Sequence, residues 1–160
     1  IYLLLQKGGT VMNILKWLSV TDRFSKVYLD NQFAQFGINS SQYLYILKIC
    51  DCPGILQESL IESIYVHPSN IVRTVSALEK KGYITRDAYD KDKRTCRLYP
   101  TEKAVEISGQ LRKISDDLKK LLMEEISEEE QEVFDRVLMK AGRRIAKELN
   151  MERKKDEDDE

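Results

Sequence analysis

The stretch Ile55–Thr101, ILQESLIESIYVHPSNIVRTVSALEKKGYITRDAYDKDKRTCRLYPT, decides the fold of this chain. Its first part predicts a short helix, because Leu56, Leu60 and Ile64 follow one another at four-residue spacing and would share one face. A tight turn around Tyr65 then separates this helix from the next predicted one. The stretch therefore begins as two short helices joined by a turn.

The second helix is expected to run from Pro68 to Lys81. Proline suits the first helical position, where no N–H is needed, and cations followed by Gly82 are typical of a helix end. Three apolar side chains are expected to face inward: Ile71, Val75 and Leu78. The opposite face carries short or polar side chains and one long cation: Ser69, Asn70, Arg73, Thr74 and Ala77. Such a face suits the major groove of DNA.

Two short strands are predicted after this helix, at Tyr83–Arg86 and Thr95–Tyr99. The charged segment Asp87–Arg94 lies between them and is predicted to be the tip of a hairpin. Two helices around a turn, followed by a β-hairpin, predict a winged helix-turn-helix. The expected fold class is therefore mainly α, with a small β-hairpin as the wing.

The same residues resemble the MarR family of bacterial transcriptional regulators. The resemblance rests on the run Leu78–Arg86, on Asp92–Arg94 in the hairpin and on Thr101, which opens the next helix, and it covers roughly Asp30 to Leu149. The family's wing commonly has Asp-Arg-Arg and ends in Leu-Thr before a helix start that contains glycine. Three residues depart mildly from this pattern: Lys93, Pro100 and Ala104. Val72 departs further, because the family often has Ser or Thr just before the arginine of this helix.

The resemblance implies a sequence-specific DNA-binding transcriptional regulator, a ligand-responsive repressor that binds an inverted-repeat operator as a homodimer. Four side chains of the second helix would then enter the major groove: Ser69, Asn70, Arg73 and Thr74. In the hairpin tip, Lys91 and Lys93 are expected on phosphates and Arg94 in the adjacent minor groove. Asp92 is expected to orient Arg94, because phosphates would repel its carboxylate. Double-stranded DNA is thus the predicted partner.

The charge distribution favours a localised phosphate-binding face. The whole chain has a formal net charge of −1, with 33% charged and 42% hydrophobic residues, which fits a helix-rich protein. From Tyr65 to Pro100, eight Lys or Arg residues stand against four Asp or Glu residues, a net charge of +4. The remainder therefore carries −5. An ordinary solvated surface is the alternative interpretation of this segment.

The chain is expected to divide into five segments. Residues 37–100 form the DNA-binding lobe, between a dimerisation helix at 12–36 and C-terminal dimerisation helices at 101–150. Residues 1–11 are either a translated leader or an N-terminal arm, and 151–160 form a charged, disordered tail. No apolar run approaches the length that spans a bilayer, so a cytoplasmic protein without a membrane partner is expected.

A heptad-like seam favours dimerisation through the C-terminal helices. On the helix expected from Thr101 to about Glu124, apolar residues recur at alternating spacings of three and four. A capping box at Ser127–Glu130 opens a last helix with an apolar face. The predicted dimer contacts are Ile107, Leu111, Ile114, Leu118, Leu121, Leu138 and Ile145. An intramolecular bundle over the core is the alternative.

Other chemistries find little support, so neither an enzyme nor a cofactor is expected. His67 is the one histidine, and the chain has no Gly-rich phosphate loop and no nucleophile motif. Cys50 and Cys52 keep a cysteine-based redox sensor open as an alternative regulator. A winged-helix module that binds proteins without recognising DNA is the other alternative. The resemblance also implies an aromatic or phenolic effector, and four side chains are candidates for its pocket: Trp17, Phe24, Tyr28 and Tyr43.

Overall fold

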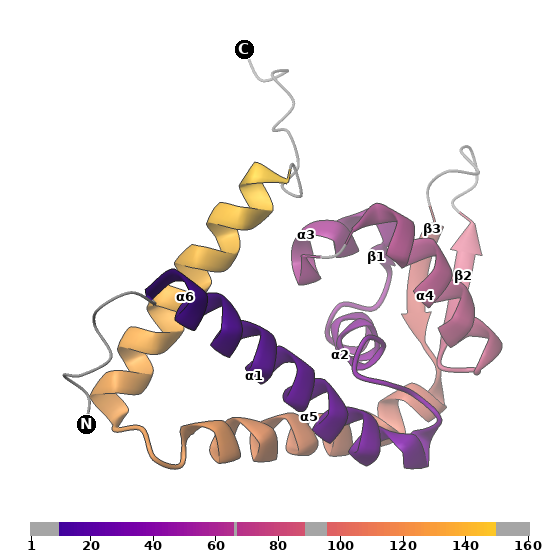
Figure 1. Ribbon diagram of the computed structural model, residues 1–160. Coiled ribbons are helices and arrows are strands. Elements are labelled where there is room, and N and C mark those ends of the chain that lie inside the picture. Colours follow the sequence, from indigo (N-terminus) through magenta and orange to yellow (C-terminus); the bar gives the residue numbers. More distant parts are fainter. Residues whose placement is uncertain (1–9, 66, 89–95, 150–160) are drawn as a thin grey trace. The chain divides into compact units, whose positions relative to one another are not determined.

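The structure, a computed structural model, describes residues 10–65, 67–88 and 96–149 (Figure 1). The chain divides into two compact units, Ile1–Ser40 and Ser41–Glu160. In the first unit, helix α1 spans Thr10–Phe33 and the 3-10 turn η2 spans Ala34–Phe36. Gly37 ends this helical region with a φ of 65°, a left-handed conformation that glycine adopts without steric cost.

Most of α1 exposes its side chains within the first unit. The exposed large apolar residues are Ile14, Leu15, Trp17, Leu18, Phe24 and Val27. Asp30 fastens the end of the helix to the following loop, because its Oδ1 accepts a hydrogen bond of 2.6 Å from the Ser40 backbone N–H. The helix expected in this region is therefore present, and its role in dimerisation stays a prediction.

The second unit combines a small antiparallel sheet with five helices of the described chain (Figure 1). The helices are α2 at Tyr43–Asp51, α3 at Leu60–Ile64, α4 at Pro68–Lys80, α5 at Glu102–Met123 and α6 at Glu128–Glu148. The strands are β1 at Ile55–Leu56, β2 at Ile84–Ala88 and β3 at Cys96–Pro100, in the spatial order β1-β3-β2. A mainly helical fold whose β2–β3 hairpin lies beside α4 confirms the predicted winged helix-turn-helix.

The first helix of the predicted pair is shorter than the sequence pattern suggests. Leu56 pairs with Arg97 of β3, and a 3-10 turn, η3, at Gln57–Ser59 precedes α3. The prediction that placed Leu56 on the helix was therefore wrong. Its four-residue spacing from Leu60 also fits a strand followed by a turn, and pairing with a distant strand decides between the two.

The turn between α3 and α4 follows the expected chemistry. Tyr65 adopts a left-handed φ of 49°, and Pro68 occupies the first turn of α4. His67 caps the helix, because its Nδ1 accepts a hydrogen bond of 3.3 Å from the Ser69 backbone N–H and lies 2.7 Å from the Ser69 hydroxyl. Gly82, with a φ of 76°, then lets the chain turn from α4 towards β2.

The core of the second unit joins α2, α3, α4, the sheet and the first half of α5. Its buried apolar side chains are Tyr45, Ile46, Ile49, Leu60, Ile71, Val75, Leu78, Tyr83, Ile84, Leu98, Ala104 and Leu111. Burying a large aliphatic side chain contributes about 1.5–3 kcal/mol to folding, so this cluster holds α4 and the wing strands in place.

The apolar seam of α5 serves two purposes along its length. Leu111 was predicted to contact a partner subunit, and this was wrong, because the side chain is fully buried where α5 packs against α2. Ile107, Ile114 and Leu118 are half-buried, whereas Leu121 is 55% exposed. The seam therefore begins in the core of the lobe and ends on its surface.

Both C-terminal helices begin at the predicted caps. The Thr101 hydroxyl accepts a hydrogen bond of 3.4 Å from the Ala104 backbone N–H. Ser127 and Glu130 form a reciprocal capping box with bonds of 3.3 and 3.0 Å. On α6, Leu138 and other apolar side chains remain exposed. Across the described parts of the chain, none of the helices combines the length and apolarity that a membrane crossing requires.

Candidate nucleic-acid interface

Helix α4 has one buried face and one exposed face. The buried face consists of Ile71, Thr74, Val75 and Leu78. The exposed or half-exposed side chains are Ser69, Asn70, Val72, Arg73, Ser76, Ala77, Glu79 and Lys80. The short side chains near the N-terminal end would allow close approach to a groove, as a recognition helix requires.

Thr74 lies on the buried face and not on the exposed one. Only 9% of the residue is exposed, and its hydroxyl is hydrogen-bonded to the phenol of Tyr45 in α2. The prediction that Thr74 contacts DNA was therefore wrong. Burial raises the pKa of Tyr45, while the Thr74 hydrogen bond and the charge of Arg73 oppose that rise.

Asn70 and Arg73 form a polar pair on the exposed face of α4. The Arg73 Nη2 donates a hydrogen bond of 3.1 Å to Asn70 Oδ1, one helical turn away. Both side chains are exposed, as is Ser69. A guanidinium held in this way can fork onto a guanine edge or a phosphate oxygen.

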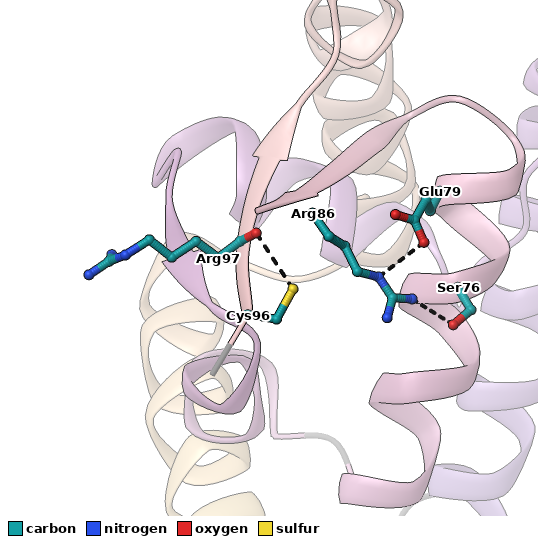
Figure 2. A network of polar contacts seen from close by, with 5 residues as sticks. All are labelled: Ser76, Glu79, Arg86, Cys96 and Arg97. Carbon is teal, nitrogen blue, oxygen red and sulfur yellow. Dashed lines mark hydrogen bonds and ion pairs between the residues drawn. The ribbon is translucent and has the colours of Figure 1, made fainter. Parts of the chain in front are cut away.

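Arg86 connects the wing to the recognition helix. From β2, its Nη2 donates a hydrogen bond of 2.6 Å to Ser76 Oγ, and its Nε forms an ion pair of 3.1 Å with Glu79 Oε2 (Figure 2). The sequence pattern predicts for Arg86 only a position on a strand. Its role emerges from the strand register, which turns the side chain towards α4.

Cys96 lies on β3 close to this network, and Figure 2 shows it with Arg86 and Glu79. Its Sγ is 3.8 Å from the Arg97 carbonyl oxygen. Burial raises the pKa of Cys96, and the charges of Glu79 and Asp87 raise it further, while Arg86 opposes them. The thiol is therefore held in its protonated, less reactive form.

The tip of the wing lies outside the described residues. Lys91, Asp92, Lys93 and Arg94 belong to that tip, so their predicted contacts with phosphates and the minor groove stay predictions. The strands that carry the tip are described, and they pair from Ile84 opposite Pro100 to Ala88 opposite Cys96. α4 and the base of the wing thus lie side by side.

The two cysteines considered for redox sensing lie at the end of α2. Burial raises the pKa of Cys50, Asp51 raises it further, and Arg112 of α5 opposes the rise. Arg112 also forms an ion pair with Asp51. A raised pKa disfavours the thiolate that reacts with oxidants, so the geometry at Cys50 disfavours the redox alternative. Cys52 is an exposed free thiol.

The four candidates for an effector pocket fall in both units. Trp17 and Phe24 are exposed on α1, and Tyr28 on the same helix is half-buried. Tyr43 of α2 is half-buried, and its phenol is hydrogen-bonded to Ser115 of α5. Burial raises its pKa. The pocket itself stays a prediction.

Two further features of the described residues bear on ligands. No group of three or more His, Cys, Asp or Glu side chains there could hold a metal ion. An open hollow of about 460 Å³ lies on α6, lined by Glu129, Glu130, Val133, Phe134 and Val137. Its walls are almost wholly apolar, which suits a protein surface better than a charged ligand.

The sequence is similar to those of known transcriptional regulators. The model of the MarR family matches residues 38–96. YybA of Bacillus subtilis (strain 168), described as an HTH-type transcriptional regulator, is 27% identical over 133 residues, which cover 83% of this chain and 89% of that protein. HosA of Escherichia coli O157:H7, a transcriptional regulator, is 27% identical over 103 residues, or 64% of this chain and 76% of that protein.

Solved structures of regulators share the fold. The transcriptional regulator SlyA has a TM-score of 0.80 at 24% identity, covering 86% of this chain and 96% of that one. A MarR family transcriptional regulator from Listeria monocytogenes, complexed with 26mer DNA, has a TM-score of 0.76 at 23% identity, covering 84% and 89%. Because the sequence identity to these structures is only 24% and 23%, the similarity shows that the fold is shared and nothing more.

Proposed function

We propose that the chain is a transcriptional regulator of the MarR family, whose model matches residues 38–96, and that it binds an inverted-repeat DNA operator as a homodimer. The observation that carries the proposal is the exposed N-terminal half of α4, where Ser69, Asn70 and Arg73 lie opposite a buried face. Such a helix lies in the major groove with its N-terminal residues on base edges. The similar regulator from Listeria monocytogenes that is complexed with DNA supports the same role.

The wing completes the proposed contact with DNA. Lys91 and Lys93 neutralise phosphates, and Arg94, oriented by Asp92, enters the adjacent minor groove. The basic segment Tyr65–Pro100, with its net charge of +4, supports this assignment, because phosphate contacts supply most of the non-specific affinity for DNA. A DNA-binding regulator would work in the cytoplasm of a bacterial cell.

Dimerisation is proposed through the helices outside the lobe. Leu121, Leu138 and Ile145 are all exposed in the single chain, at 55%, 44% and 57%. An apolar surface of this extent on α5 and α6 would favour association with a second copy. Two-fold symmetry then places the two α4 helices in successive major grooves, so the half-sites should lie about one helical turn apart.

Selection of duplexes from a random library by the purified protein tests the proposal. The expected result is enrichment of an inverted repeat, bound far more tightly than a scrambled duplex in fluorescence anisotropy at a fixed salt concentration. A dimeric, folded protein that enriches no sequence would overturn the proposal and favour a module that binds other proteins.

Regulation by a small molecule is the second part of the proposal: an aromatic or phenolic anion lowers the affinity for the operator, which is the behaviour of a ligand-responsive repressor. Three aromatic side chains of α1 support binding of such a ligand: Trp17, Phe24 and Tyr28. Trp17 is the one tryptophan of the chain, so its fluorescence should change on titration with salicylate or benzoate. An unchanged fluorescence together with an unchanged operator affinity would contradict this part alone.

A further inference from the structure

Val72 is an unusual residue on the exposed face of α4. The other large aliphatic side chains of this helix, Ile71, Val75 and Leu78, are all buried, whereas Val72 is 55% exposed. Among the residues of α4 whose burial the structure describes, it is the one exposed aliphatic side chain. It lies in the N-terminal half of the helix, next to Arg73, where a recognition helix meets base edges.

The neighbours of Val72 leave its methyl groups accessible. Ser69 and Ser76, one turn before and one turn after it, are short. The guanidinium of Arg73 is hydrogen-bonded to Asn70, which lies on the side of α4 away from Val72. Arg86 reaches α4 from β2 and hydrogen-bonds Ser76, one turn after Val72, and Val72 nevertheless remains 55% exposed.

The chemistry of an isopropyl group restricts what it can recognise in a major groove. It can form no hydrogen bond, and only thymine among the four bases presents a methyl group there. Apposing two methyl groups removes apolar surface from water, which is favourable. Apposing the valine to a carbonyl or amino group of a base edge would instead desolvate a polar group without a partner.

We propose that Val72 is a specificity-determining residue that contacts the C5-methyl group of a thymine, once in each half-site. This inference rests on the proposed function, since it names one base that the proposed interface selects. Val72 distinguishes thymine from the other bases through shape and desolvation, whereas Arg73 distinguishes bases through hydrogen bonds. A serine or threonine here would offer the groove a hydroxyl, so the valine gives this chain its own base preference.

Deoxyuridine scanning tests the inference, because deoxyuridine pairs like thymidine but lacks the C5-methyl group. Each thymine of the selected duplex is replaced in turn, and dissociation constants are measured by anisotropy for the wild type and Val72→Ala. At one symmetric position, the wild type should bind the deoxyuridine duplex about fourfold more weakly, the effect of one lost methyl contact. Val72→Ala should respond clearly less to the same replacement, because the two γ-methyl groups that would contact the thymine are gone.

Val105→Ala is the matched control, since Val105 is 56% exposed but lies on α5. This variant should keep the wild-type affinity and the wild-type response to deoxyuridine, and thermal melting should show all three proteins equally folded. An equal deoxyuridine response in the wild type and Val72→Ala, or no sensitive thymine in the selected sequence, would overturn the inference and leave operator binding intact. Failure to select any sequence would overturn the proposed function instead.

Discussion

At the scale of single residues, neighbouring positions of α4 have opposite roles. Arg73 is exposed and Thr74 is buried, although the two are adjacent and both polar. Arg73 lies where it can donate to DNA, and Thr74 instead donates to or accepts from the phenol of Tyr45. A substitution at one should therefore change DNA binding, and a substitution at the other should change stability.

Arg73→Ala should weaken operator binding by about 1–3 kcal/mol and relax the base preference at one position in each half-site, because a forked hydrogen bond is lost. Anisotropy with single-base variants of the selected duplex measures both effects. Arg136→Ala, which removes an exposed arginine of α6, is the control and should bind as the wild type does. Wild-type affinity of Arg73→Ala would mean that α4 does not enter the groove with this face.

Thr74→Val should destabilise the fold by about 1 kcal/mol, because it keeps the shape but leaves the buried Tyr45 phenol without this partner. Urea unfolding measures the loss. The double variant Tyr45→Phe, Thr74→Val removes both partners and should recover part of the stability. Additive losses in the double variant would contradict a direct hydrogen bond between the two side chains.

At the scale of elements, α4 and the wing are joined by side chains of β2. Arg86 hydrogen-bonds Ser76 and forms an ion pair with Glu79, so it joins β2 of the wing to α4. α5 likewise connects two regions, since its first half completes the core and its last turn is exposed. At each of these two places, a substitution can distinguish an effect on folding from an effect on DNA binding or dimerisation.

Arg86→Lys should weaken operator binding about two- to fivefold with little loss of stability, since an ammonium cannot fork onto both the Ser76 hydroxyl and the Glu79 carboxylate. The salt dependence of binding should stay unchanged, because no phosphate contact is removed. Thr85→Ala, at an exposed position of the same strand, is the matched control. A shallower salt dependence in Arg86→Lys would show that Arg86 itself contacts DNA.

Leu111 and Leu121 should respond differently although both belong to the apolar seam of α5. Leu111→Ala should cost about 2–5 kcal/mol of unfolding free energy, because the side chain is fully buried. Leu121→Glu should leave the lobe folded and shift the protein towards monomers, because a charge would then be buried against the partner. Sedimentation velocity and urea unfolding separate the two effects. A dimeric Leu121→Glu would place the interface elsewhere.

At the scale of the whole molecule, several buried groups give stability the same dependence on pH. Burial raises the pKa of the thiols of Cys50 and Cys96 and of the phenols of Tyr43, Tyr45 and Tyr83. The folded state therefore keeps protons that the unfolded chain releases at alkaline pH. By linkage, stability falls wherever the unfolded state binds fewer protons.

Stability should accordingly be constant near neutral pH and fall as the pH rises above about 8.5, where thiols in the unfolded chain ionise, with a further fall above about 10 from the phenols. Urea midpoints measured from pH 7 to 10.5 test this. The variant Cys50→Ser, Cys96→Ser should lose the first fall and keep the second. A midpoint that rises with pH across this range would contradict the assigned burial of these groups.

The sequence by itself determined the local signals of the fold. Pro68 and Gly82 mark the limits of α4, and Thr101 and the Ser127 capping box open the last two helices where expected. These signals depend on hydrogen bonds and backbone conformations within a few residues, so they can be recognised without the rest of the chain. The exposed positions of Ser69, Asn70 and Arg73 followed from the helical period in the same way.

The tertiary structure alone decided the partners of several side chains. Leu56 belongs to a strand because it pairs with β3. Thr74 lies inward because its hydroxyl is hydrogen-bonded to the phenol of Tyr45 in α2, and Leu111 is buried because α5 packs there against α2. The register of β2 places Arg86 where it forms an ion pair with Glu79 of α4. In each case the deciding contact comes from a segment distant in sequence. Periodicity can say that a face is apolar or polar, but burial depends on which element packs against it.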